Sequence, residues 1–171
     1  MYKFISCKTN QLRKSDLNKI IQLKDTFWKF GKFSQLKWFK KNIMKNDIHN
    51  LLFNEKDLIG YTCLRKKKLI KDKNKINFLL FDTIVIHPNF RKKGLSKILM
   101  KKNNSVIKKK KIISILVCSR KLQSFYKKFK WHKESSKKFN FIGLNLKKKL
   151  IFSFNVNFKF KNLQLLINHV Q

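Results

Sequence analysis

A strand, a turn, a helix and a second strand follow one another in the middle of the chain, and this succession constrains the fold more than any other feature. The apolar run INFLLFDTIVI (residues 76–86) predicts a buried strand that ends before Pro88, the only proline in the sequence. The segment NFRKKGLSKILMKK (residues 89–102) predicts a turn that continues into a helix, and IISILVC (residues 112–118) predicts another buried strand. Strands joined through a helix pair in parallel, so this part of the chain predicts a parallel crossover.

The remaining patterns predict an antiparallel meander, further helices and a C-terminal hairpin. Strands are predicted at residues 2–8, 49–53 and 58–64, helices from Ser15, from near Ser34 and over residues 121–129, and the final hairpin from FNFIGLNL (residues 139–146) and LIFSFNVNFKF (residues 150–160). The resulting order, β-α-α-β-β-β-α-β-α-β-β, describes a mixed α/β fold (α+β, with a mixed sheet). No repeat or linker divides residues 1–171, which predicts a single domain.

Two of the predicted helices have specific capping and burial patterns. Ser15 is expected to cap the first helix, whose apolar positions follow a 3.6-residue period that only Lys24 interrupts. In the helix that follows the central turn, Leu95, Ile98 and Leu99 are expected to face inward.

The charge of the chain is extreme, with 43 Lys and Arg against 8 Asp and Glu and a formal net charge of +35. Such a surface attracts the phosphates of nucleic acid or anionic lipid. The chain is also rich in Asn, Ile and Phe and has only four Gly and one Pro. Codons rich in A and T encode the abundant residues, so a drifted genome would produce this composition in any fold. We therefore interpret most of the lysines as solvated, and a basic RNA- or ribosome-associated binding protein without catalysis is the alternative function.

Compartment and oligomeric state are less constrained by the sequence. No apolar run approaches the roughly 20 residues that span a bilayer, and the N-terminus has no apolar stretch of signal-peptide length, so we expect a cytoplasmic protein without a membrane partner. Cys7, Cys63 and Cys118 form no CxxC or Cys/His cluster, so no metal is expected. The sequence leaves monomer and homodimer open.

The turn RKKGLS (residues 91–96) has the composition of an anion-binding site. A helix N-terminus presents backbone N–H groups without intrahelical partners, together with the positive end of the helix dipole. Gly94 permits a close approach or a left-handed conformation, and Arg91, Lys92 and Lys93 add positive charge. This combination suits a pyrophosphate, although RKKG taken alone would be an ordinary basic turn.

The segment I-H-P-N-F-R-K-K-G-L-S (residues 86–96) resembles the signature of the GNAT superfamily of acyl-CoA-dependent N-acetyltransferases, in which a strand ending in V-x-P precedes R/Q-x-x-G-x-G/A and a helix. The strand ILVCSR and the helix LQSFYKKFKWHK correspond to the family segment that usually ends as Y-x-x-x-G-F. Two positions depart from the pattern, because Ser96 replaces the last Gly or Ala and Lys130 replaces the Gly before Trp131. The resemblance implies a GNAT-like fold and the transfer of an acetyl group from acetyl-CoA, as co-substrate, to a primary amine in a ternary complex. A CoA-binding relic without turnover is a third interpretation.

The resemblance also implies roles for named residues. The pantetheine arm would pair with the strand edge, where the amide of Ile86 would polarise the thioester carbonyl, and the turn would hold the phosphates. The implied cofactor-binding residues are Ile84, Val85, Ile86, Arg91, Lys92, Lys93, Gly94, Leu95 and Ser96. Tyr126 falls on the family's helix tyrosine and is the candidate general acid for the CoA thiolate. Its alternative role is core packing beside Phe125 and Phe129.

An attacking amine needs a proton acceptor, for which the candidate is Asp82. Strand alternation predicts that Asp82 shares a face with Ile84 and Ile86, and burial there would raise its pKa. The alternative is an Asp at a bulge, bonded to nearby backbone. His87 is the second choice as base, and His49 is expected to be structural.

The acceptor is expected to bind beside the two N-terminal helices and their connection. That segment holds an excess of aromatic residues, namely Phe27, Trp28, Phe30, Phe33, Trp38 and Phe39. Some of these rings would line a pocket, or they would all close the core. If Lys29, Lys32 and Lys37 face the cleft, a small anionic acceptor such as a nucleotide-linked amino sugar would fit.

Overall fold

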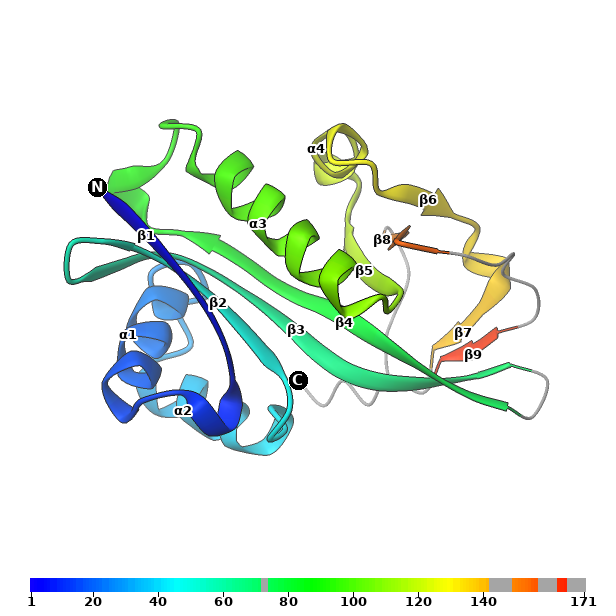
Figure 1. Ribbon diagram of the computed structural model, residues 1–171, viewed down its shortest axis with the longest axis horizontal. Coiled ribbons are helices and arrows are strands. Elements are labelled where there is room, and N and C mark those ends of the chain that lie inside the picture. The colour runs from blue at the N-terminus through cyan, green and yellow to red at the C-terminus, as the bar shows by residue number, and fades with distance from the viewer. Residues whose placement is uncertain (72–73, 142–148, 157–162, 166–171) are drawn as a thin grey trace. The chain divides into compact units, whose positions relative to one another are not determined.

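The computed structural model describes residues 1–71, 74–141, 149–156 and 163–165 (Figure 1). The chain divides into two compact units. Unit 1 contains Met1–Arg65 and Asp82–Val106, and unit 2 contains Lys66–Phe81 and Ile107–Gln171. Two long strands, β3 (Asp57–Lys71) and β4 (Asn74–Ile86), contribute to both units.

Unit 1 is a sheet with helices on both faces. Besides β3 and β4 it contains β1 (Tyr2–Lys8), α1 (Lys14–Asp25), α2 (Lys32–Asn42), β2 (Ile48–Asn54) and most of α3 (Leu95–Lys110). The strand order in its sheet is β1-β2-β3-β4. Strand β2 pairs antiparallel with both β1 and β3, and β3 lies next to β4 in the sheet, as expected for the predicted meander of residues 49–53, 58–64 and 76–86. The two sheet faces carry separate apolar clusters, as expected from the period-2 alternation of strand side chains.

The two clusters of unit 1 fix which helices lie on which face. One cluster joins α1 and α2 to the sheet through Ile20, Leu23, Phe39, Leu51, Tyr61 and Val85. The other joins α3 to the opposite face through Leu95, Leu99, Leu52 and Ile59, with Ile84 and Ile86 packed against it. The sheet of unit 1 is therefore enclosed between α1 and α2 on one side and α3 on the other, which positions the end of β4 between two layers of helices.

Unit 2 contains the parallel crossover. Strand β5 (Ser114–Ser119) pairs in parallel with β4 over two residues each, Leu79 opposite Ser114 and Leu80 opposite Ile115. The other elements are α4 (Gln123–Lys128), β6 (His132–Glu134), β7 (Phe139–Phe141), β8 (Lys149–Phe154) and β9 (Leu163–Leu165). Strand β8 lies between β5 and β6 and is antiparallel to both. The crossover predicted from the sequence is thus confirmed.

Two local predictions were wrong. Ser15 lies inside α1, whose N-cap is Arg13 and makes no side-chain cap bond. Ile98 is 40% exposed, because the buried stripe of α3 instead passes through Leu95, Leu99 and Met100. The final hairpin stays a prediction, because much of it lies outside the described residues.

The described parts of the two predicted hairpin strands pair with other strands, since a strand pattern does not specify its partners. In the described ranges β8 pairs with β5 and β6, while β7 pairs in parallel with β9. Strand β6 is only three residues long and polar, so no periodic signal marks it in the sequence. Residues 142–148 and 157–162 of the two predicted strands lie outside the described residues. Within the described part of the chain, no helix is long and apolar enough to cross a bilayer.

Candidate active site

The turn between β4 and α3 begins with a short, tightly bonded segment. Residues Pro88–Phe90 form one 3-10 turn, in which the Asn89 N–H donates to His87 Nδ1 (3.3 Å) and the Arg91 N–H to the Pro88 carbonyl (3.1 Å). The chain then takes positive φ angles at Lys92 (63°) and Gly94 (74°). A left-handed residue turns its neighbouring amides toward the same side of the chain, which is the geometry of an anion-binding nest.

Five consecutive amides in this turn point away from any protein partner. The N–H groups of Lys92, Lys93, Gly94, Leu95 and Ser96 have no acceptor among the described residues. The first helical bonds of α3 start only at Lys97 and Ile98, whose amides donate to the Gly94 carbonyl (2.9 and 3.4 Å). These amides lie at the positive end of a 16-residue helix, an arrangement whose geometry and electrostatics suit a phosphate-sized anion.

The basic side chains of the turn are partly committed to local contacts. Arg91 Nε donates to the Ile86 carbonyl (3.2 Å), and its guanidinium lies 5.6 Å from the ring centre of Phe27. Lys93 Nζ lies 5.3 Å from the ring centre of Phe90. The backbone amides are thus the open donors of the turn, and the lysines and arginine supply the surrounding positive charge.

The last residues of β4 present backbone groups on the edge away from β3. The His87 N–H donates to the Ile59 carbonyl of β3 (2.8 Å), so alternation directs the backbone groups of Ile84 and Ile86 to the opposite edge. The ladder between β4 and β5 includes only Leu79 and Leu80 of β4. The backbone groups of Ile84 and Ile86 are therefore directed away from β3.

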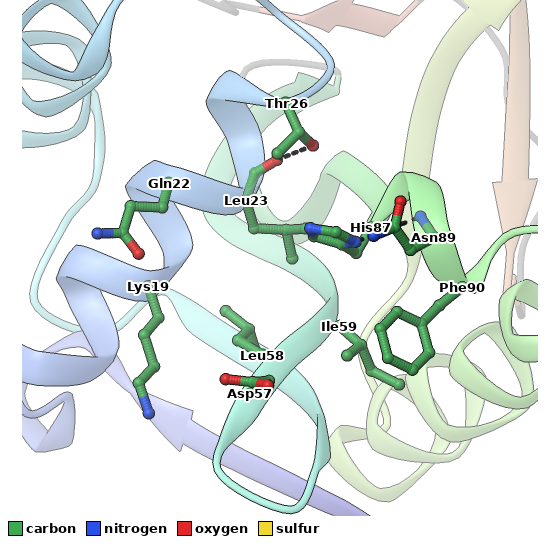
Figure 2. Close-up of a pocket in the computed structure, with 10 residues that line it drawn as sticks. All are labelled: Lys19, Gln22, Leu23, Thr26, Asp57, Leu58, Ile59, His87, Asn89 and Phe90. Atoms are coloured by element: carbon green, nitrogen blue, oxygen red, sulfur yellow. Dashed lines mark hydrogen bonds between the residues drawn. The ribbon is translucent and has the colours of Figure 1, made fainter.

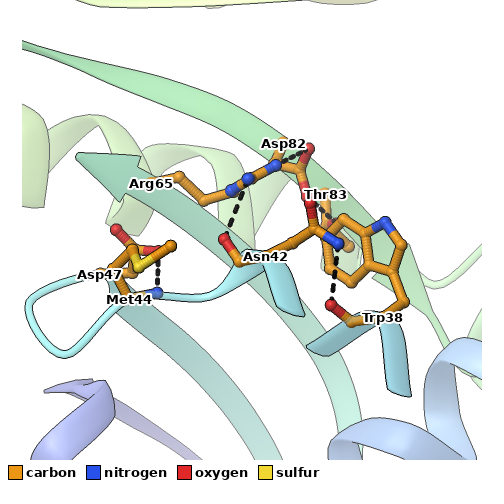
Figure 3. A network of polar contacts seen from close by, with 7 residues as sticks. All are labelled: Trp38, Asn42, Met44, Asp47, Arg65, Asp82 and Thr83. Atoms are coloured by element: carbon orange, nitrogen blue, oxygen red, sulfur yellow. Dashed lines mark hydrogen bonds and ion pairs between the residues drawn. The ribbon is translucent and has the colours of Figure 1, made fainter. Parts of the chain in front are cut away.

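Asp82 lies in a buried polar network (Figure 3). Its carboxylate forms an ion pair with Arg65 (Nη1 to Oδ1, 3.5 Å) and accepts from the Thr83 hydroxyl (3.3 Å). The Arg65 and Asp82 side chains are only 1% and 8% exposed. Arg65 Nη2 donates to the Asn42 carbonyl at the C-terminal end of α2 (2.9 Å), where the helix dipole favours a cation. The candidate base is thus held by a partner that the sequence analysis did not identify.

Asp82 does not share a face with Ile84 and Ile86, contrary to the expectation from strict alternation. Its partner Arg65 packs against Trp38 of α2, and Val85 belongs to the apolar cluster of α1 and α2. Ile84 and Ile86 pack on the α3 face. The alternation of β4 is therefore interrupted between Asp82 and Val85, which brings the carboxylate to the face covered by the N-terminal helices.

Tyr126 is buried within unit 2 and is 4% exposed. Its ring packs against Phe81, Trp131 and Phe152 at centroid distances of 6.2, 6.3 and 6.0 Å. Its hydroxyl has no hydrogen-bond partner among the described residues, and burial raises its pKa, as does the nearby Cys118 thiol. The hydroxyl is therefore protonated at neutral pH, as a proton donor must be.

His49 is fully buried and bonded at both ring nitrogens. The Thr9 hydroxyl donates its hydrogen to the Met44 carbonyl (2.7 Å), so His49 Nε2 must donate to Thr9 Oγ1 (2.9 Å). His49 Nδ1 then accepts from the Tyr61 hydroxyl (2.8 Å). Phe39 and Tyr61 stack against the imidazole at centroid distances of 5.6 and 5.9 Å. These contacts give His49 the structural role expected for it.

The burial of His49 makes stability depend on pH. Desolvation, with a smaller contribution from Lys24, lowers the pKa of His49 from 6.5 to about 4. Between these pH values His49 is protonated in the unfolded chain but neutral in the folded chain. The free energy of unfolding therefore decreases as pH falls from 6.5 toward 4. Between pH 7.5 and pH 5, this group alone should lower the free energy of unfolding by about 2 kcal/mol. Urea unfolding of wild type and His49→Asn at both pH values measures this change. An equal decrease in the free energy of unfolding in both proteins would contradict the assignment of the pH dependence to His49.

The aromatic residues of the N-terminal helices divide between core and surface. Phe39 is buried, and Trp28 and Trp38 pack partly buried against the same apolar cluster. Phe27, Phe30 and Phe33 are 57%, 71% and 79% exposed. Lys29, Lys32 and Lys37 are also exposed. The cations in the buried network are instead Lys24 and Arg65. In the sequence, only Lys24 was noticeable, because it interrupts an apolar stripe.

A cavity of about 370 Å³ lies in unit 1 beside the start of the turn (Figure 2). Helix α1 forms one wall, and the start of β3 and the segment 87–90 form the other. Its lining residues are Lys19, Gln22, Leu23, Thr26, Asp57, Leu58, Ile59, His87, Asn89 and Phe90. His87 follows Asp82 by five strand positions, a span of about 16 Å. The cavity therefore adjoins the anion-binding end of β4 and not Asp82.

Comparisons with known proteins bear on the family and the fold of the chain. A family model described as an acetyltransferase (GNAT) domain matches residues 17–147. Among solved structures, an acyl-CoA N-acyltransferase from Pseudomonas aeruginosa is 12% identical, with a TM-score of 0.68 over 90% of this chain and 99% of that chain. The ribosomal-protein-S18-alanine N-acetyltransferase from Escherichia coli is 12% identical, with a TM-score of 0.63 over 90% and 92%.

A third structure was solved with a ligand. The PaiA N-acetyltransferase from Thermoplasma acidophilum, in complex with coenzyme A, is 19% identical, with a TM-score of 0.56 over 88% of this chain and 98% of that chain. No curated protein matches the chain at the level of sequence. The family model covers most of the chain and includes β4, the turn and α3, so this protein belongs to the GNAT family and is an acetyltransferase.

Proposed function

We propose that this acetyltransferase transfers the acetyl group of acetyl-CoA to the primary amine of a small-molecule acceptor by direct transfer in a ternary complex. The observation that carries the proposal is the row of five unpartnered amides from Lys92 to Ser96 at the N-terminus of α3. A pyrophosphate needs several convergent donors, and backbone amides at a helix N-terminus supply them without side-chain entropy. The coenzyme A complex of the PaiA enzyme, which shares the fold, supports the same ligand here.

The donor would extend from the turn along the end of β4. The outward-facing backbone groups of Ile84 and Ile86 would pair with the pantetheine arm, and Val85 between them keeps the strand anchored in the core of α1 and α2. The Ile86 N–H is the donor nearest to the turn on this edge and would polarise the thioester carbonyl. Fixed donors of this kind stabilise the negative charge that develops on the carbonyl oxygen during attack.

The transfer requires two proton movements, one away from the attacking amine and one onto the departing thiolate. A neutral amine attacks the acyl carbon, the new C–N bond forms, and the C–S bond breaks. Asp82 would accept the proton that the amine loses, and Tyr126 would donate a proton to the departing thiolate. The ion pair with Arg65 holds the Asp82 carboxylate in place, and the protonated hydroxyl of Tyr126 suits the acid.

Replacement of Tyr126 by Phe tests its role as the acid. No hydrogen-bond partner of the hydroxyl lies in the described part of the chain, so packing and melting temperature should stay close to wild type, while kcat should fall by about tenfold or more. Thiol release from acetyl-CoA at saturating amine measures kcat, and a melt on the same sample measures stability. Phe125→Leu, a neighbouring ring that carries no hydroxyl, serves as the packing control. Unchanged kcat in Tyr126→Phe would assign Tyr126 to the core alone.

The same samples distinguish the enzyme from an RNA-binding protein. The exposed rings Phe27, Phe30 and Phe33, interleaved with lysines, are the feature that favours RNA. Thermal-shift titration with acetyl-CoA and with mixed RNA at physiological salt separates the two. We expect acetyl-CoA to raise the melting temperature. A response to RNA with none to acetyl-CoA would contradict the proposed function.

A further inference from the structure

Lys24 is a buried cation without a hydrogen-bond acceptor. It lies on α1 and is 6% exposed, and its Nζ lies 4.1 Å from the ring centre of Trp38. No carboxylate or carbonyl among the described residues accepts from it. A cation–π contact of this kind offsets about 2 kcal/mol, less than the several kcal/mol that burial of an ammonium costs.

Arg65 shares the same indole. Its guanidinium carbon lies 5.4 Å from the ring centre of Trp38, its two Nη atoms bond to Asp82 and Asn42, and its buried Nε has no partner. Two desolvated cations therefore surround one aromatic ring, and each retains an unused donor. Such an arrangement is costly unless an anion joins it.

The charged groups around Lys24 do not supply enough negative charge to compensate its ammonium. Desolvation lowers the pKa of Lys24, the Asp82 carboxylate and the Cys63 thiol raise it by less, and Arg65 lowers it further. The existing carboxylate thus does not compensate the ammonium. Asp47, another buried acid of unit 1, accepts from the Met44 amide and is not among the groups that act on Lys24.

We propose that the acceptor is an amine that also carries a carboxylate, which Lys24 and the Nε of Arg65 bind over the Trp38 ring. This inference rests on the proposed function, since Asp82, the base assigned there, belongs to the same network. A carboxylate held by the two cations places the amine of the same small molecule next to Asp82. The exposed lysines of the α1–α2 connection are not needed for this recognition.

Matched pairs of acceptors test the inference. Amino acids such as phenylalanine and lysine are compared with their decarboxylated counterparts, phenethylamine and cadaverine, by thiol release from acetyl-CoA and by mass spectrometry of the product. Wild type should favour the carboxylated member of a pair by about tenfold in kcat/KM, the effect of one charge-assisted hydrogen bond. Lys24→Met should remove that preference, so that the ratio of kcat/KM between the two members of a pair falls to about one.

Two variants control for charge and for structure. Lys24→Arg keeps the cation and should retain most of the preference, and Lys41→Met removes an exposed lysine of α2 and should change nothing. Equal kcat/KM for both members in wild type, or an equal loss for both in Lys24→Met, would overturn the inference. Calorimetric binding of acetyl-CoA is measured separately. Loss of that binding would count against the proposed function, whereas intact binding with no carboxylate preference would count against this inference alone.

Discussion

Replacement of Asp82 by Asn should lower kcat about a hundredfold, the usual contribution of a general base. The amide has nearly the same shape but cannot accept the proton that the amine loses. The measurement is thiol release at saturating amine and acetyl-CoA, so that any effect on acceptor affinity does not enter kcat. Acetyl-CoA affinity should remain as in wild type, because the turn that would hold the phosphates lies beyond the C-terminal end of β4 and does not include Asp82.

The buried ion pair complicates this experiment and also offers its control. Asn at position 82 leaves the Arg65 guanidinium, which is 1% exposed, without its carboxylate, and an uncompensated buried charge costs about 3–5 kcal/mol of stability. The double variant Arg65→Met/Asp82→Asn removes both charges and should recover much of that stability. If Asp82 is the base, kcat stays low in the double variant. Recovery of kcat together with stability would show that Asp82 acts only through the fold.

Replacement of Gly94 by Val should weaken acetyl-CoA binding about thirtyfold. Gly94 has a φ of 74°, a region that costs a residue with a side chain about 1–2 kcal/mol and a β-branched residue more. A Cβ there would meet nothing within 4 Å, so the penalty comes from the backbone and not from a clash. The turn would relax to a negative φ and redirect the amides of Lys93 and Leu95. Calorimetric titration with acetyl-CoA measures the loss.

Asn at the same position is the matched control, because it tolerates the left-handed region. The affinity of Gly94→Asn for acetyl-CoA should stay within a few-fold of wild type, even though Asn adds a bulky side chain at this position. Wild-type affinity in Gly94→Val would remove the turn from the phosphate site. A similar loss in both variants would instead indicate that a side chain of any kind blocks the ligand.

The parts of the site that are local in sequence could be predicted, and the parts that depend on contacts between distant segments could not. The turn Arg91–Ser96 was recognisable because strand, glycine, basic residues and helix lie within a dozen positions. The ion pair between Arg65 and Asp82 joins residues that lie 17 positions apart in separate strands. The local sequence around either residue therefore does not predict it. The interrupted alternation near Asp82 also leaves no mark in the composition of β4, since apolar residues occupy both of its faces.

Predictions about the fold failed for related reasons. Ile98 and Leu99 are adjacent and similar, and which of them is buried depends on the rotation of α3 against the sheet. The period-2 pattern of β8 correctly indicates a strand, yet its partners β5 and β6 are selected by topology. Lys24 was visible as a break in a helical stripe, but its significance appears only with Trp38 and Arg65 around it.

The hydrogen bonds of His49 have a consequence for the path of protons. Each group from Tyr61 through His49 to Thr9 gives its single hydrogen to the next, and the series stops at the Met44 carbonyl, which cannot take up a proton. The series therefore holds the strands together and does not conduct protons, although its Tyr61 belongs to the same apolar cluster as Val85. If Asp82 is the base, the proton that it collects would not leave along this series.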